Sequence, residues 1–184
     1  MDRKRTTTVS KFFSKHLRHD PAALGLTLQT GGWVLIDDLL AASANVGLPI
    51  TRTELDEVVR TCDKQRFAID ETGTRIRANQ GHSVEVNLEL TPATPPAVLY
   101  HGSAEPNHES ILRDGLQKMR RHHVHLSRDT ATARKVGARH GVPVLFAVDT
   151  EAMARDGFSF YVSSNGVWLV DAVPRQYLRP LEPV

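Results

Sequence analysis

Apolar residues in the first part of the chain recur at helical spacing. Over residues 9–17 they fall three and four positions apart, which predicts an amphipathic helix with Ser10 near its start as a candidate cap. Pro21 disfavours helical backbone at the residue before it, so the helix should end shortly before that point. Arg18 and His19 are therefore expected at the exit of a helix.

More helices and a hairpin are expected before residue 80. Asp37 is placed to cap one helix, and residues 51–54 match the capping-box pattern ahead of another. Residues 66–69 and 75–78 alternate between apolar and polar positions on either side of a polar, glycine-containing turn, which predicts a β-hairpin. Helices followed by a two-stranded wing indicate a winged-helix-like lobe over residues 1–90, and such lobes often bind nucleic acid.

A proline-rich segment follows this lobe. Residues 91–97 hold three prolines and show no periodicity, which is typical of a stiff linker. Residues 98–184 contain helical stretches at 109–114 and 130–139, the second with Asp129 as its cap. The same region holds short apolar segments that we expect to be strands, at 98–100, 124–126, 142–148, 158–162 and 167–170. The fold class is therefore predicted to be α+β.

Composition narrows the class of protein. Of 184 residues, 40% are hydrophobic and 24% are charged, as in ordinary globular proteins. No apolar run is long enough to span a membrane, and none follows the basic amino terminus, so we expect a cytoplasmic protein without a secretory signal. Cys62 is the single cysteine, which excludes an intramolecular disulfide and a cysteine-rich zinc site.

The net charge of +2 conceals an excess of arginine, since 17 of the 23 basic residues are of this type. Residues 113–139 hold eight basic side chains against two acidic ones, so this region should present a positive surface. The planar guanidinium suits phosphate and carboxylate groups. A solvated charged face would show the same pattern, and the two interpretations stay open here.

Three segments of the first lobe are candidates for chemistry. The pair Arg18 and His19 places a permanent cation beside a group that titrates near neutrality. Arg66 alternates with Phe67 and so faces away from the apolar side of its strand. In residues 80–83 a glycine lies between polar side chains, where backbone amides could approach an anion. Each segment also has a structural explanation: a helix end, a surface strand and a polar turn.

The second lobe offers a polar strand face. Residues 100–103 end one strand, and His123, His125 and Ser127 share one face of another. Together with His101 these histidines could hold zinc, although no zinc-binding motif accompanies them.

Two further candidates lie in loops of this lobe. Arg120 and Arg121 lead directly into the histidine-containing strand. Asn165 begins an Asn-Gly pair, which is most often only the corner of a hairpin.

Taken in order, these segments resemble the KptA-like family of RNA 2′-phosphotransferases over nearly the whole chain. The resemblance is carried by Leu17-Arg18-His19, Lys64-Gln65-Arg66-Phe67, residues 75–83, Leu99-Tyr100-His101-Gly102-Ser103, residues 123–127 and residues 165–169. It implies an amino-terminal winged-helix lobe that holds RNA, aided by the basic amino terminus. It also implies a carboxy-terminal lobe similar to ADP-ribosyltransferases, with a split β-sheet, that binds NAD.

The resemblance also implies an active site. Its Arg-His-Arg-Arg tetrad falls on Arg18, His19, Arg66 and Arg121, the last chosen over Arg120 because it stands two residues before the His-Val-His-Leu motif. The implied NAD-binding residues are His101, Gly102, Ser103, His125, Ser127 and Asn165. The expected substrates are NAD and an RNA that carries a 2′-phosphate, and we expect a monomer that needs no metal.

Two departures bear on the chemistry that the resemblance implies. Ser103 stands where the family usually has threonine, which keeps the hydroxyl. Val167 occupies the region where toxin-like ADP-ribosyltransferases carry a glutamate; that glutamate helps to activate a neutral acceptor, whereas a 2′-phosphate is already an anion. Two alternatives remain: an ADP-ribosyltransferase for terminal nucleic-acid phosphates or proteins, and a non-catalytic winged-helix RNA-binding module.

Overall fold

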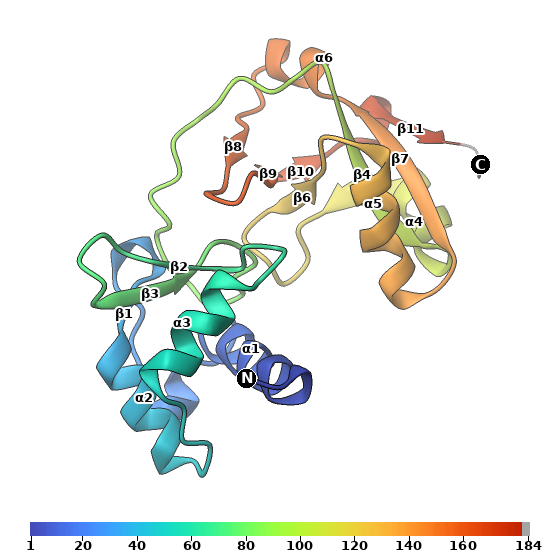
Figure 1. The fold of residues 1–184 in the computed structure, drawn as a ribbon. Coiled ribbons are helices and arrows are strands. Elements are labelled where there is room, and N and C mark those ends of the chain that lie inside the picture. The colour runs from blue at the N-terminus through green and yellow to red at the C-terminus, as the bar shows by residue number, and fades with distance from the viewer. Residues whose placement is uncertain (182–184) are drawn as a thin grey trace. The chain divides into compact units, whose positions relative to one another are not determined.

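The computed structural model describes residues 1–181, without the side chain of His140, and divides into two compact units, Met1–Glu89 and Leu90–Val184. Each unit combines helices with small antiparallel sheets, so the fold class is α+β, as predicted (Figure 1). Within the described residues, no helix has the length and apolar character needed to span a membrane.

The first unit contains three α-helices and one three-stranded sheet. Its elements are α1 (Arg3–His16), β1 (Val34–Leu35), α2 (Ile36–Asn45), α3 (Arg52–Arg60), β2 (Phe67–Ile69) and β3 (Arg75–Ala78), with short 3₁₀ turns at Ala22–Leu24 and Thr30–Gly32. Strands β2 and β3 form the predicted hairpin, and β1 pairs with the other edge of β3. Helices and strands bury their apolar side chains in one hydrophobic core.

Helix starts in this unit differ from two of the predictions. Asp2, not Ser10, caps α1, because its carboxylate accepts a hydrogen bond of 2.7 Å from the backbone N–H of Arg5. The helix is therefore longer than the apolar pattern alone suggested. Asp37 is also not a cap: α2 follows Leu35 without a side-chain cap, and Asp37 lies in its first turn, where a negative charge is favourable.

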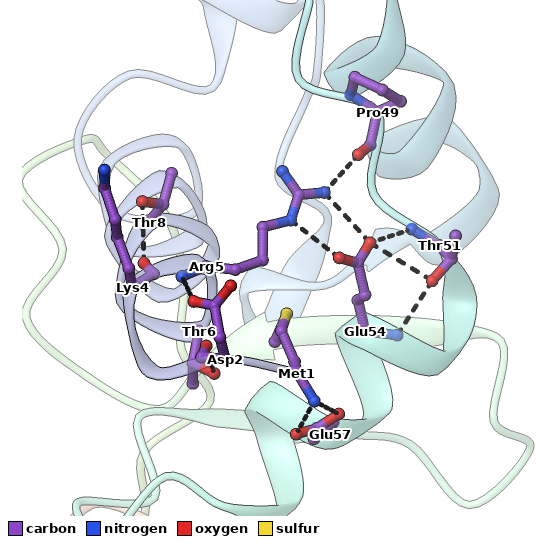
Figure 2. Close-up of polar contacts among 10 residues, drawn as sticks. All are labelled: Met1, Asp2, Lys4, Arg5, Thr6, Thr8, Pro49, Thr51, Glu54 and Glu57. Carbon is purple, nitrogen blue, oxygen red and sulfur yellow. Dashed lines mark hydrogen bonds and ion pairs between the residues drawn. The ribbon is translucent and has the colours of Figure 1, made fainter.

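An ion pair joins α1 to the start of α3 (Figure 2). Nε of Arg5 donates to Oε1 of Glu54 at 2.8 Å, and Oε2 of Glu54 accepts from the backbone N–H of Thr51 at 2.9 Å, which completes the predicted capping box. The hydrogen bonds from Arg5 and then from Thr51 lower the pKa of Glu54 to about 2. Arg5, part of the basic amino terminus, is thus engaged within its own unit.

In the second unit, the described residues 90–181 form two three-stranded sheets and one strand pair. Its strands are β4 (Val98–Ala104), β5 (Leu116–Gln117), β6 (Val124–Leu126), β7 (Pro143–Asp149), β8 (Tyr161–Val162), β9 (Trp168–Val170), β10 (Ala172–Val173) and β11 (Leu178–Leu181). All pairings are antiparallel, in the orders β11-β7-β4, β6-β9-β8 and β10-β5. Tyr100 of β4 and Ser127 after β6 bridge the two larger sheets.

Three helices accompany these sheets: α4 (His108–Asp114), α5 (Thr130–Gly137) and α6 (Thr150–Arg155). The first ends at Gly115 and the second is capped by Asp129, both as predicted, whereas α6 was not expected. Helix α5 lies directly against β4. A side-chain Cβ built on Gly102 would come within 1.8 Å of the backbone oxygen of Ala133, so only glycine permits this approach.

The proline-rich segment 91–97 packs on the second unit. Pro92 forms a β-bridge with Tyr161, and the backbone N–H of Ala93 donates to Phe160 at 2.8 Å. At the other end of the segment, the carbonyl of Ala97 accepts from the start of α6. The boundary between the units therefore falls ahead of the prolines, between Glu89 and Leu90.

Candidate functional site

Arg18 and His19 follow directly on α1, whose C-cap is Leu17. The backbone N–H of His19 donates to the carbonyl of Lys15 at 2.9 Å, so the backbone keeps a helical turn past the cap. Arg18 is half-buried and His19 is exposed. The prediction that both residues occupy a helix exit is confirmed.

The segment after β3 lies against this helix end. The backbone N–H of Ser83 donates to the carbonyl of Arg18 at 2.9 Å, and the Ser83 hydroxyl lies 2.8 Å from Nδ1 of His19. Gly81 has a positive φ of 89°, and a Cβ built there would stand 3.7 Å from Nη1 of Arg18. The chain thus turns at a glycine directly beside a guanidinium group.

Arg66, just before β2, is held at both its backbone and its side chain. Its carbonyl accepts from the backbone N–H of Asn79 at 2.9 Å. Its Nη1 donates to the sulfur of Cys62 at 3.3 Å, and its backbone N–H lies 3.5 Å from the same sulfur. The contact uses one of the five N–H donors of the guanidinium, so the group keeps donors for an anion.

The short segment Asn79–Ser83 therefore contacts both Arg66 and the helix end that carries Arg18 and His19. Asn79 is hydrogen-bonded to Arg66, and Ser83 is hydrogen-bonded to Arg18 and His19. Four extended residues span at most about 14 Å, so the backbones that carry the three cationic or titratable side chains lie in one region of the first unit. The fold thus brings together Arg18 and His19, the segment Asn79–Ser83, and Arg66, which lies between them in the sequence.

In the second unit, the predicted residues gather where β4 meets β6. Nδ1 of His101 lies 3.0 Å from the carbonyl oxygen of His125. Tyr100 and Ser127 exchange two backbone hydrogen bonds of 2.8 Å each. His101, His125 and Ser127 thus belong to one strand junction.

The alternation predicted for β6 is confirmed. Val124 and Leu126 are 4% and 1% exposed and belong to the hydrophobic core, while His123, His125 and Ser127 are only half-buried. Among the side chains that the structure describes, no group of three histidine, cysteine, aspartate or glutamate residues could hold a metal ion.

The charge of Arg121 acts on this junction. Burial lowers the pKa of His101, the hydrogen bond with the carbonyl of His125 opposes that shift, and the positive charge of Arg121 lowers the pKa further. Arg121 lies in the exposed loop between β5 and β6, where its backbone N–H donates to Lys118 at 3.0 Å. Arg120 is exposed in the same loop but is not one of the groups that shift His101.

The remaining predicted residues have structural partners. The Ser103 hydroxyl accepts from Nδ2 of Asn107 at 3.0 Å. Asn165 lies in the turn between β8 and β9, where its Oδ1 accepts from the buried Ser163 hydroxyl at 2.7 Å and Gly166 has a positive φ of 78°. The Asn-Gly pair is thus a hairpin corner. Since β9 pairs with β6, this corner lies at the end of the sheet that carries Ser127.

Two residues that hold the first-unit site were not predicted from the sequence. Cys62 was considered only for disulfides and zinc, and Asn79 only as part of a motif. Asn79 is 8% exposed, and its Nδ2 donates to the carbonyl of Gln65 at 2.6 Å. The available signal was an asparagine directly after a predicted strand; that its amide is buried, and so needs partners, is seen only in the structure.

One unit holds cationic side chains around a glycine turn, and the other holds histidines and hydroxyls along a strand junction. Such groups are typical of an enzyme that binds and transfers an anionic group. The model of the RNA 2′-phosphotransferase, Tpt1/KptA family matches residues 4–172. The chain belongs to this family, whose members are NAD-dependent transferases.

Relatives of similar length support the assignment. A probable RNA 2′-phosphotransferase of Trichormus variabilis is 58% identical over 97% of this chain and 98% of the relative. Proteins of the same description in Nostoc punctiforme and Streptomyces coelicolor are 56% and 57% identical; the matches cover 98% and 97% of this chain and 100% and 97% of those relatives.

Proposed function

We propose that this enzyme removes an internal 2′-phosphate from RNA by transferring it to the ADP-ribose part of NAD. The observation that carries the proposal is the segment Asn79–Ser83, which is bonded to Arg66 at one end and to Arg18 and His19 at the other. Charge-assisted hydrogen bonds contribute about 1.5–3 kcal/mol each. Several guanidinium groups therefore favour a branched phosphate over an ordinary linkage.

We assign RNA binding to the first unit and NAD binding to the second. Three helices followed by the β2–β3 hairpin, with β1 on the far edge of β3, support a winged-helix-like lobe. Two separate three-stranded sheets in the second unit support a split sheet similar to that of ADP-ribosyltransferases. These assignments rest on fold analogy.

In the first proposed step, a 2′-phosphate oxygen attacks the anomeric carbon of the nicotinamide ribose. Nicotinamide leaves with the electrons of the glycosidic bond, and the RNA carries an ADP-ribosylated phosphate. Arg18, Arg66 and Arg121 would orient the phosphate and offset the repulsion between it and the pyrophosphate of NAD. No residue needs to deprotonate the nucleophile, in keeping with Val167 in place of an acidic side chain.

In the second proposed step, the 2″-hydroxyl of the ribose loses its proton as its oxygen bonds to phosphorus, the bond between phosphorus and the RNA 2′-oxygen breaks, and that oxygen takes up a proton. The products are RNA with a free 2′-hydroxyl and ADP-ribose 1″,2″-cyclic phosphate. With Nδ1 of His19 at the Ser83 hydroxyl, Nε2 is the nitrogen that would donate a proton to the departing oxygen.

NAD would lie along the junction of β4 and β6. The candidate contacts are His101, Gly102, Ser103, His125, Ser127 and Asn165. Burial and the charge of Arg121 keep the pKa of His101 low, so a neutral imidazole would face the dinucleotide. The action of Arg121 on this imidazole also favours Arg121 over Arg120 as the fourth member of the tetrad.

The decisive experiment is mass analysis of the products formed from NAD and an oligoribonucleotide with one internal 2′-phosphate. We expect free nicotinamide, ADP-ribose cyclic phosphate and dephosphorylated RNA. An RNA with a terminal phosphate tests the alternative acceptor: ADP-ribosylated RNA from that substrate alone would favour a different transferase. RNA binding without nicotinamide release would favour a non-catalytic module.

Two variants of neighbouring residues give a matched comparison. Both Arg120 and Arg121 are exposed, so neither replacement should affect folding. Arg121→Ala is expected to abolish phosphate release, and Arg120→Ala to retain most of it.

For His19→Ala, ADP-ribosylated RNA should accumulate if the second step is the slower one. Unchanged rates of both steps would remove His19 from the mechanism.

A further inference from the structure

A groove lined largely by hydroxyl-bearing and charged residues lies in the first unit between α1 and the end of α3. Its volume is about 370 Å³, at the lower end of the range of small-ligand sites. Its lining residues are Thr6, Thr7, Ser10, Lys11, Ser14, Val58, Thr61, Cys62, Asp63, Lys64 and Arg66. Arg66 belongs both to this groove and to the proposed phosphate site, so the two are continuous at that residue.

One wall of the groove is the hydrophilic face of α1. Thr6, Ser10 and Ser14 are spaced by four residues and so lie along one side of the helix, about 12 Å from end to end. Val9 and Phe13, fully buried, lie on the adjoining side of the helix and belong to the core, so the row of hydroxyls runs along the border of the buried face. Four residues beyond Ser14 the chain reaches Arg18, so this side of α1 leads toward the proposed phosphate site.

The other wall adds charge. Lys64 and Arg66, in the turn between α3 and β2, line the groove together with Lys11 of α1, and Asp63 is the single acidic side chain in the lining. Lys11 and Lys64 are exposed, so their positive charges cost little desolvation. A groove with excess positive charge and hydroxyl groups suits a phosphodiester chain.

We propose that this groove binds backbone phosphates of the RNA nucleotides next to the one that carries the 2′-phosphate. The inference rests on the proposed function and extends it to the substrate beyond the reacting group. A strand places one phosphate about every 3.4 Å along a duplex axis, and single strands are more extended, so about 12 Å accommodates more than one. Contacts of this kind position RNA without reading its sequence.

Not every hydroxyl in the groove can serve this role. The hydroxyls of Thr6, Thr7 and Thr61 donate to carbonyls one turn earlier in their own helices, at 2.8, 2.8 and 2.7 Å (Figure 2 shows the Thr6 contact). The phosphates would therefore be bound by Lys11, Lys64, Ser10 and Ser14.

The test compares two substrates in the full-length enzyme. One is a minimal dinucleotide with a 2′-phosphate, and the other carries the same junction within a longer RNA extended on both sides. In the double variant Lys11→Gln/Lys64→Gln, we expect KM for the long RNA to rise about 10-fold with kcat unchanged, and both constants for the dinucleotide to stay as in the wild type. The slope of log affinity against log salt should become shallower by about 1.4, because two phosphate contacts to a single strand are lost.

Lys15→Gln is the matched control, because Lys15 lies on α1, is exposed and does not line the groove. It should leave both substrates unaffected. An equal loss for dinucleotide and long RNA would overturn the proposal by placing the lysines at the reacting group. An unchanged KM for the long RNA, or a loss no larger than that of Lys15→Gln, would overturn it as well.

Direct binding keeps this inference separate from the proposed function. The dissociation constant of a fluorescent long RNA, measured by anisotropy without NAD, should rise about 10-fold in the double variant. If the wild-type enzyme released no phosphate, the proposed function would fail, while the same binding loss would still support the groove. If binding is unchanged although the enzyme is active, the groove proposal fails and the function stands.

Discussion

Replacing Gly102 by alanine should destabilise the second unit through a clash between β4 and α5. Gly102 is implied to contact NAD, yet in the structure it is a point where strand β4 and helix α5 approach closely. An alanine Cβ would lie 1.8 Å from the backbone oxygen of Ala133 and 2.6 Å from its carbonyl carbon. Carbon atoms pack at about 3.5–4.0 Å, so the helix would have to move by roughly 1.5 Å.

The cost should exceed that of ordinary overpacking. Extra methyl groups in a core cost about 1–3 kcal/mol when side chains can adjust. Here the obstacle is helix backbone, and α5 is close to β4 at a second place, where a Cβ on Gly137 would lie 2.6 Å from the backbone oxygen of Ser103. We therefore expect a loss of about 3 kcal/mol or more. For a unit of fewer than 100 residues this corresponds to a fall in Tm of about 12–24 °C.

Thermal unfolding followed by circular dichroism and calorimetry measures this effect. Gly157→Ala is the matched control, because Gly157 has a positive φ of 94° but no atom within 4 Å of a built Cβ. It should lose only about 1–2 kcal/mol, the cost of left-handed backbone in a residue with a side chain. A Gly102→Ala protein that melts within about 3 °C of wild type and still loses NAD binding would refute the packing argument and assign the glycine to ligand approach.

Three other outcomes follow from the charges. Glu54→Gln should cost about 1 kcal/mol above pH 5, and because the folded pKa of Glu54 is about 2, the difference from wild type should vanish as the pH falls toward 2 in acid unfolding curves. By NMR titration, Arg121→Gln should raise the pKa of His101 and Arg120→Gln should not; an unmoved pKa in the first variant would contradict the placement of Arg121. EDTA should leave phosphate release unchanged, since we expect arginines to supply the positive charge, and inhibition reversed by added metal would contradict this.

Local patterns predicted elements whose ends are fixed by local contacts. The capping box at Thr51, the cap at Asp129 and the hairpin of β2 and β3 are all present. The start of α1 was missed although Asp2 is a local cap, because residues 3–8 contain no apolar residue and so show no periodicity. The ion pair that also holds this part of the helix joins Arg5 to Glu54, 49 positions apart. Periodicity carries no information on such pairs.

In the candidate site too, local sequence patterns predict strand geometry but not the contacts that depend on tertiary packing. The alternation of β6 predicted which side chains share a face, since this depends only on strand geometry. The contact of Cys62 with Arg66 was not predictable, because it depends on how the turn after α3 closes on β2. The packing role of Gly102 was likewise hidden, because it depends on a helix that begins 28 residues later.

Backbone hydrogen bonds attach Asn79 to Arg66 and Ser83 to Arg18. The number of residues between these two attachment points is therefore critical for the position of the site residues. Deleting one residue there would shift one attachment point by as much as about 3.6 Å, and misplacement of reacting groups by even 1 Å can cost about 100-fold in rate. An insertion in the exposed turn around Gly47 would leave both attachment points in register. Tolerance to insertions and deletions should therefore differ sharply between these two parts of the same unit.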